Sequence, residues 1–381
     1  MRICIVTSNV RKGDGQARVN YEIVQAALQR GHQITLLLRH AAPEFTDHPA
    51  VQYVVFSMKK IPSELMKGLV FSWYNDRWLR QHSHKFDAIL SCGAVTSLPT
   101  TVNVVHFVHS AWMKSPFHTF AMERNIYGVY QWIYSALNSY WEKNAFRQAE
   151  VLVAVSETIR REMMAEGIPD EQIRVIGNGV DTQEFEPADA AQKSLMRQQL
   201  GFSDRQPLAL FVGDFKTNRK NLDSVLKALV QVPQLHLVVV GKAENSPYPQ
   251  LAQNLGLAER VHFLGYRSDI PKIMQATDFF VFPSRYEPFG MVILEAMAAG
   301  LPVITSAIAG ASTIVNPDCG IVLKDSENIT VLAEAMRDLT VDRDRAVQMG
   351  QKARAIAEQH SWHSKAECYM DLLESRMGNR L

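Results

Sequence analysis

Short apolar runs of three to seven residues alternate along the chain with longer stretches in which apolar residues recur at helical spacing. This alternation is typical of βαβ units, in which parallel strands form a sheet and the connecting helices cover it. We therefore predict an α/β protein. The predicted strands of the first half are residues 2–7, 34–38, 51–56, 88–91, 102–108, 151–155 and 174–176. Those of the second half are residues 209–212, 236–240, 261–263, 279–282, 302–305 and 320–322.

The predicted strands fall into two groups, and each group is large enough for its own doubly wound parallel sheet. A turn-rich stretch from Gly177 to Pro187 separates the groups. We therefore predict an N-terminal domain of residues 1–180 and a second domain of residues 181–361, with a last helix in residues 362–381.

Composition narrows the class of protein. Hydrophobic residues make up 47% of the 381 residues and charged residues 21%, which is typical of a globular protein, and a net charge of +1 gives a nucleic-acid partner no electrostatic support. The four cysteines form no CxxC pair, which fits a reducing compartment. The chain begins directly with a predicted strand and its apolar runs are too short to span a bilayer. These features predict a cytoplasmic protein.

Two carboxylates, Glu287 and Glu295, stand on either side of a Pro-Phe-Gly turn that follows the predicted strand 279–282 and precedes a helix. Ligand sites of α/β proteins are built at the carboxyl ends of strands, and the first turn of a helix binds anions. At 1.5 Å rise per residue, the two carboxylates lie about 12 Å apart at most. Carboxylates accept hydrogen bonds from hydroxyls. Hydroxyls at both ends with phosphate between them describe a sugar nucleotide.

Other loops of the second half carry groups that suit the same ligand. The predicted strand 209–212 ends at Gly213, and the loop that follows contains Arg219 and Lys220, which suit a diphosphate. A solvated surface loop is the alternative for this basic pair. Tyr266 and Arg267 close the predicted strand 261–263 and are candidates for contact with a base.

Two features of the first half are candidates for ligand contact. The loop Gly13-Asp-Gly15 lies between the first strand and a helix predicted from about Val19, and it either approaches a sugar or phosphate or is a purely structural turn. It lacks the third glycine of a dinucleotide-binding loop. His109 directly follows the predicted strand 102–108 and is either a ligand-facing or a structural histidine, whereas His106 within that strand is expected to pack in the core.

Taken together, these motifs resemble the family 4 retaining glycosyltransferases. The resemblance is carried by Pro283-Ser-Arg-Tyr-Glu-Pro-Phe-Gly, followed by Leu-Glu295-Ala-Met-Ala-Ala-Gly300-Leu-Pro-Val. It extends to Val155-Ser156-Glu, Val175-Ile-Gly-Asn-Gly-Val-Asp181, Val261-His-Phe-Leu-Gly-Tyr266 and Trp362. The match covers most of residues 150–365 and is looser over residues 1–150. One departure is Asp214, where many members have arginine, so that positive charge for phosphate must come from Arg219 and Lys220.

The resemblance implies the GT-B fold, in which two Rossmann-like domains face each other across a cleft and the last helix crosses back to the first domain. It implies an acceptor domain in residues 1–180 and a nucleotide-sugar donor domain in residues 181–361. By position in this sequence, it assigns Glu287 and His109 to the donor sugar as catalytic residues and Glu295 to the ribose. It assigns the diphosphate to Arg219 and Lys220, and phosphate or sugar to the N–H groups of Phe289, Gly290 and Met291. Gly15 is assigned to the border of donor and acceptor.

The implied reaction moves a sugar from a nucleoside diphosphate sugar, most commonly a UDP-sugar, to a hydroxyl of a glycan, a lipid-linked or a small-molecule acceptor. GDP- and ADP-sugars stay open as donors. No metal or other cofactor is implied. A front-face mechanism with retention is implied, in which the leaving phosphate takes the acceptor's proton. Two alternatives are a sugar-nucleotide epimerase of the same fold and a non-catalytic carbohydrate-binding protein.

Residues 56–85 form a basic amphipathic segment. It contains six basic residues, among them Lys59, Lys60 and Lys67, and two acidic residues, Glu64 and Asp76. Apolar residues recur at helical spacing within it, among them Ile61, Leu65, Met66, Leu69, Val70, Trp73 and Trp78. They either pack on the first sheet or dock on an anionic membrane that carries a lipid-linked or lipopolysaccharide acceptor. Both alternatives stay open from the sequence.

Overall fold

The computed structural model describes residues 1–378 except for residues 13–14, 41–42, 123, 216 and 244–245. The chain divides into two compact units, Met1–Asn178 with the residues from Trp362 onward, and Gly179–Ser361. Each unit contains a parallel sheet with helices packed on it, so the predicted α/β class is confirmed.

The first unit is built on a sheet in the order β3-β2-β1-β4-β5-β6-β7, and all of its described strand pairs are parallel. Its interior strands are almost completely buried, because helices cover both faces. The strands are β1 (Arg2–Val6), β2 (Gln33–Leu38), β3 (Val51–Val55), β4 (Ala88–Cys92), β5 (Thr100–Val105), β6 (Ala149–Ala154) and β7 (Ile173–Val175). The helices are α1 (Gly15–Gln29), α2 (Glu64–His82), α3 (His109–Lys114), α4 (Thr119–Met122), α5 (Ile126–Gln148), α6 (Glu157–Ala165) and α14 (Trp362–Gly378).

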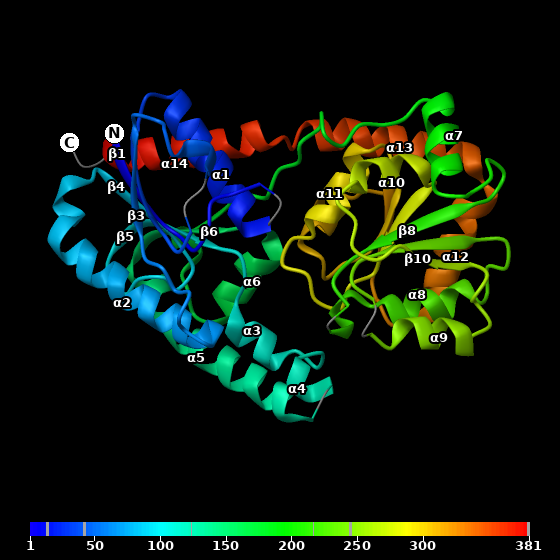
Figure 1. The fold of residues 1–381 in the computed structure, drawn as a ribbon, viewed down its shortest axis with the longest axis horizontal. Helices are drawn as coiled ribbons and strands as arrows, with labels where there is room; N and C mark the ends of the chain where they lie inside the picture. Colours follow the sequence, from blue (N-terminus) through cyan, green and yellow to red (C-terminus); the bar gives the residue numbers. More distant parts are fainter. Residues whose placement is uncertain (13–14, 41–42, 123, 216, 244–245, 379–381) are drawn as a thin grey trace. The chain divides into compact units, whose positions relative to one another are not determined.

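The last helix, α14, packs beside α1 in the first unit (Figure 1). Arg30, just after α1, donates to carboxylates on three turns of α14, with distances of 2.8 Å to Glu374 and 2.6 Å to Asp371 and a further contact to Glu367. At the other end of the pair, the Arg18 guanidinium lies 5.7 Å from the Trp362 ring centroid. These contacts fix α14 along the length of α1.

Two predicted element bounds were wrong. Helix α1 begins at Gly15 instead of near Val19, and Ala17 and Arg18 are buried in it because they pack on the sheet and on α14. Strand β5 ends at Val105, so His106 lies beyond the strand and His109 is separated from it by three residues. The backbone leaves the sheet there to begin α3 at His109. Gly13 of the glycine-containing loop lies outside the described residues.

The second unit contains a sheet in the order β10-β9-β8-β11-β12-β13, again with parallel pairing. The strand order reverses between β8 and β11, and ligands of such sheets bind beside that point, at the carboxyl ends of the strands. The strands are β8 (Leu208–Val212), β9 (His236–Val240), β10 (Val261–Phe263), β11 (Phe279–Phe282), β12 (Val303–Ser306) and β13 (Gly320–Leu323). The helices are α7 (Ala190–Gln199), α8 (Leu222–Leu229), α9 (Tyr248–Asn254), α10 (Ile270–Ala276), α11 (Met291–Ala298), α12 (Ile329–Val341) and α13 (Arg343–Glu358).

Candidate functional site

The loop between β11 and α11 makes a turn that requires glycine at position 290. Gly290 is the N-cap of α11 and has φ of 92°, a conformation that residues with a side chain rarely adopt. A Cβ atom at this position would lie 2.9 Å from Ile293 Cδ1 and 3.1 Å from Glu287 Cγ. The turn therefore brings Glu287 close over the start of α11. No described backbone carbonyl accepts from the N–H groups of Phe289, Gly290 or Met291, so these donors are available to an anion.

A basic loop between β8 and α8 reaches the same place. Lys220 ends a short 3-10 turn, Asn218–Lys220, and its Nζ forms an ion pair with Glu287 Oε2. Both side chains are mostly buried, with 15% and 11% exposed, and the Lys220 Nζ lies 5.1 Å from the Phe282 ring centroid. Burial lowers the pKa of Lys220 in spite of the adjacent Glu287 carboxylate. The structure thus brings together the predicted diphosphate cation and the predicted sugar carboxylate.

Arg285 holds the two loops against each other, a role that the sequence did not reveal. Its buried guanidinium donates to both Asp223 oxygens at 2.7 and 2.9 Å and to both Glu327 oxygens at 2.8 and 2.9 Å. It also donates to the Asn218 carbonyl at 2.9 Å, and its backbone N–H donates to the Arg219 carbonyl at 2.8 Å. Burial opposes the charge, but the hydrogen bonds to Asp223 and Glu327 outweigh burial and raise the pKa of Arg285.

Asn221 completes the junction of the two loops. Its φ of 65° is in the left-handed region, which asparagine tolerates better than most residues, and it begins α8 directly after Lys220. Its buried Nδ2 donates to the Pro283 carbonyl at 2.9 Å and to the Ser326 carbonyl at 2.8 Å. The side chain therefore ties the start of α8 to the end of β11, which fixes the position of Lys220.

The remaining predicted residues of this unit are close to the same edge of the sheet. Glu295 lies half-buried in α11, one turn and a half from Gly290. Tyr266 is 72% exposed after β10, and the Lys242 Nζ lies 5.6 Å from its ring centroid, so its ring is accessible for stacking. Arg267 instead donates to both oxygens of Asp269 at 2.8 and 2.6 Å, which occupies its guanidinium in this state.

In the first unit, His109 is held by a residue that the sequence analysis did not single out. The buried carboxylate of Glu142 on α5 accepts from the His109 backbone N–H at 2.9 Å and pairs with His109 Nδ1 at 2.5 Å. Because a carboxylate only accepts, Nδ1 carries the hydrogen and Nε2 is left for another partner. The ring is fixed further by Phe107 and Tyr134, with centroids at 4.8 and 5.8 Å.

His109 lines a cavity of about 430 Å³, called here the α2–α5 cavity. Its walls come from α2, α5, the start of α1 and the loops after β1, β2, β4 and β5, so it opens at the carboxyl edge of the sheet. Gln16 of α1 lines it, and Gly15 is the preceding residue. The cavity is large enough for a sugar-sized ligand.

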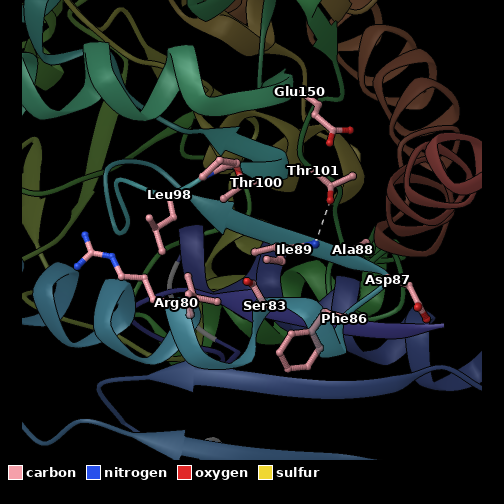
Figure 2. Close-up of a pocket in the computed structure, with 12 residues that line it drawn as sticks. Arg80, Ser83, Phe86, Asp87, Ala88, Ile89, Leu98, Thr100, Thr101 and Glu150 are labelled. Carbon is pink, nitrogen blue, oxygen red and sulfur yellow. Dashed lines mark hydrogen bonds between the residues drawn. The ribbon is translucent and has the colours of Figure 1, made fainter. Parts of the chain in front are cut away.

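A second cavity of the first unit lies at the opposite edge of the same sheet (Figure 2). Its volume is about 340 Å³, and it is lined by Ala88 and Thr100, which begin β4 and β5. Figure 2 shows the Ile89 N–H donating to Thr101 Oγ1, at 3.1 Å. None of the predicted site residues lines this cavity, so it does not belong to the candidate site.

Two family models match the chain one after the other. Residues 13–184 match Glycosyltransferase Family 4, and residues 192–356 match Glycosyl transferases group 1. The protein is a member of glycosyltransferase family 4. The expected GT-B fold is confirmed as well, since the solved structures that resemble the chain are glycosyltransferases of this fold.

Two relatives of this family 4 member come from different bacteria. Lipopolysaccharide glucosyltransferase WaaG of Escherichia coli K12 is 32% identical over 188 residues, which are 48% of this chain and 50% of the relative. A GDP-mannose-dependent monoacylated phosphatidylinositol monomannoside mannosyltransferase of Corynebacterium glutamicum is 33% identical over 244 residues, 60% of this chain and 63% of the relative. The matches thus span about half to three fifths of these relatives' lengths.

Among solved structures, HepE of Anabaena in complex with UDP and glucose has a TM-score of 0.73 at 24% identity, covering 98% of this chain and 99% of HepE. At this identity the likeness extends to the fold.

Proposed function

We propose that this family 4 member transfers a sugar from a nucleoside diphosphate sugar to an acceptor hydroxyl, with retention of configuration, in the synthesis of an envelope glycan or glycolipid. The observation that carries the proposal is the Lys220–Glu287 pair, which lies beside N–H groups at the start of α11 that have no backbone acceptor among the described residues. The Arg285 junction holds the loops that carry the pair. A cation and backbone donors stabilise a leaving diphosphate, and a carboxylate accepts from sugar hydroxyls.

The ligand-free pairing of Lys220 with Glu287 has a consequence for donor binding. A lysine ammonium has three donors, so Lys220 can retain Glu287 and still bind a phosphate oxygen. With the pair retained, the other oxygen of the Glu287 carboxylate accepts from the hydroxyls of the donor sugar. We assign the ribose to Glu295, the base to Tyr266 and Arg267, and the diphosphate to Arg219 as well as Lys220. His109, held by Glu142, is the group of the first unit that we assign to the sugar.

UDP is our first choice of nucleotide because HepE, which shares the fold, was solved with UDP and glucose. The mannosyltransferase relative uses GDP-mannose, so the base is to be determined by direct comparison of UDP, GDP and ADP. We assign donor binding to the second unit and acceptor binding to the first, and retention is proposed to proceed through a front-face mechanism without a metal.

The two carboxylates provide the test of these roles. Glu287→Gln is expected to lower turnover by about 100-fold with little change in nucleoside diphosphate affinity, since we assign Glu287 to the sugar. Glu295→Gln is expected to do the reverse and weaken the nucleotide itself. Calorimetry with the nucleoside diphosphate and steady-state kinetics separate the two effects. If both variants lose only nucleotide affinity, the assignment of Glu287 to the sugar is wrong.

We further propose that the protein works at the cytoplasmic face of an anionic membrane. Helix α2 buries Phe71, Asn75 and Leu79, whereas Met66, Leu69 and Trp73 are exposed, so these three do not pack on the sheet. The first sixteen residues of α5 contain no charged residue, and Ile126 and Tyr140 are 91% and 73% exposed. Seven more large apolar side chains of α4 and α5 are exposed: Phe120, Met122, Tyr127, Val129, Trp132, Ile133 and Leu137. Exposed apolar patches mark interaction surfaces, and basic residues beside aromatic ones favour anionic lipid. Among the described helices, none is both long enough and apolar enough to cross a bilayer.

Co-sedimentation with liposomes tests the membrane surface. Binding is expected with vesicles that contain anionic lipid and is expected to fall with added salt. Lys59→Glu with Lys60→Glu, and separately Ile126→Ser with Trp132→Ser, are each expected to reduce the bound fraction several-fold. Val341→Ser, which removes an exposed apolar side chain from the second unit, is the control and leaves binding unchanged. No binding of the wild type at low salt would contradict the proposal and favour a soluble acceptor.

A further inference from the structure

Arg39 lines the α2–α5 cavity, and the neighbouring groups neutralise its positive charge only in part. It follows β2 directly, and its backbone N–H donates to the Ser8 carbonyl at 3.2 Å. Its guanidinium lies 5.2 Å from the ring centroid of the buried Phe71, and its side chain is 16% exposed. Burial lowers the pKa of Arg39, which is the expected effect of an apolar environment on a cation.

Within the described part of the chain, the Arg39 guanidinium has few hydrogen-bond partners. Nη1 donates to Glu64 Oε2 at 3.3 Å, a long contact for a charged pair, and Glu64 also accepts from Lys67 at 2.6 Å. The Glu64 side chain is 62% exposed, so water competes for it. The Nε atom of Arg39 is buried and has no hydrogen-bond partner within the described part of the chain. A buried cation with unsatisfied donors lowers the stability of the fold unless a ligand accepts hydrogen bonds from it.

The other carboxylates that line the cavity are already engaged. Asp76 accepts from the Ser97 N–H at 2.9 Å and from the hydroxyls of Thr96 and Ser97. Glu142 holds His109. Tyr134 lines the cavity as well, and its ring lies 5.8 Å from that of His109. The same cavity therefore contains a fixed histidine and a cation that has only the long Glu64 contact among the described side chains.

We propose that Arg39 binds an anionic group of the acceptor, a phosphate or a carboxylate, while the reacting hydroxyl of the acceptor lies toward His109. The planar guanidinium has the geometry for a bidentate contact with such a group. This inference rests on the proposed function in taking the α2–α5 cavity as the acceptor side. It adds that the acceptor carries negative charge, which distinguishes it from a neutral sugar.

The test uses the full chain saturated with UDP, so that the diphosphate groups of the second unit are occupied, and titrates glucose 6-phosphate and glucose by calorimetry. The wild type is expected to bind glucose 6-phosphate about 10- to 100-fold more tightly than glucose, in line with one bidentate charged contact. Arg39→Gln is expected to reduce this preference to within about 2-fold, and Arg39→Lys to restore it in part. Arg80→Gln removes an exposed arginine of α2 that does not line the cavity and serves as the control, with the preference unchanged.

Thermal unfolding separates recognition from a structural role. Arg39→Gln is expected to melt at the same temperature as the wild type or higher, because it removes a buried charge that is poorly compensated. A lower melting temperature together with equal loss of glucose and glucose 6-phosphate binding would show a structural role and overturn the inference. Equal affinity of the wild type for the two probes, or an unchanged preference in Arg39→Gln, would also overturn it. UDP affinity, measured in the same samples, tests the donor site separately.

The source of the anion is decided by a third probe, dihexanoyl phosphatidic acid below its micelle concentration. If it binds in an Arg39-dependent manner and at least about 10-fold more tightly than glucose 6-phosphate, the anion belongs to a lipid headgroup. If it binds equally or less tightly than glucose 6-phosphate, the anion belongs to a soluble sugar phosphate. Either result supports an anionic acceptor, provided that binding depends on Arg39.

Discussion

Lys220→Ala is expected to weaken the binding of a nucleoside diphosphate by about 2–5 kcal/mol, because it leaves phosphate charge without its buried cation. The effect is large because Lys220 is mostly buried, where a charged contact is less screened by water. Lys272→Ala removes an exposed lysine of α10 in the same unit and is expected to leave the affinity within about 2-fold. Isothermal calorimetry measures both variants.

Lys220→Ala also leaves the Glu287 carboxylate without its partner, so part of its effect is on stability. Lys220→Met combined with Glu287→Leu removes both charges and is expected to recover the unfolding free energy while donor binding stays lost. Together the two variants distinguish a folded protein that lacks its phosphate contact from a destabilised one. Unchanged nucleotide affinity in Lys220→Ala would sink the assignment of Lys220 to the diphosphate.

Arg285→Met is expected to lower the free energy of unfolding of the second unit by about 3–5 kcal/mol. The reason is that Asp223 and Glu327 would lose the cation that both their carboxylates share, and the Asn218 carbonyl would lose its donor. Because Arg285 fixes the loop that carries Lys220, nucleotide affinity is expected to fall in the same variant even though Arg285 contacts no ligand in this assignment.

Urea unfolding measures the Arg285 effect, and Arg267→Met is the matched control. Arg267 makes a similar bidentate pair with Asp269, but the two side chains are 38% and 34% exposed. An exposed pair contributes at most about 1 kcal/mol, so the control should change stability little. A loss below about 1 kcal/mol in Arg285→Met would show that the junction does not hold the loops together.

The fold class could be predicted from the sequence because strands buried on both faces appear as continuous apolar runs. The run at 279–282 and strand β11 have the same bounds, and the run at 236–240 corresponds to β9 in the same way. The ends of strands and helices were harder to predict from the sequence. The apolar pattern 102–108 continues past the end of β5 because Val108 is buried as the N-cap of α3, so burial alone did not mark the end of the strand.

The candidate site was predictable where its residues lie beside a strand end in one motif, as Glu287 and Gly290 do. The residues that position them were not. Arg285 lies in the same motif, but its partners Asp223 and Glu327 are 62 and 42 residues away, and nothing in local spacing pairs them. Glu142 is likewise 33 residues from His109, in the middle of a helix, where a glutamate is usually exposed. Such long-range pairs require the tertiary fold.

The measurement that tests the account most directly is the incubation of the wild type and Glu287→Gln with UDP-, GDP- and ADP-sugars, with and without glucose 6-phosphate as acceptor. Nucleoside diphosphate release and the fate of the sugar are followed by chromatography and NMR. We expect that one nucleotide sugar supports acceptor-dependent release and a glycosidic product. Glu287→Gln is expected to lose most of this release while it still binds the nucleoside diphosphate. An epimerised nucleotide sugar formed without acceptor, or equal release by the wild type and the variant, would contradict the proposed function.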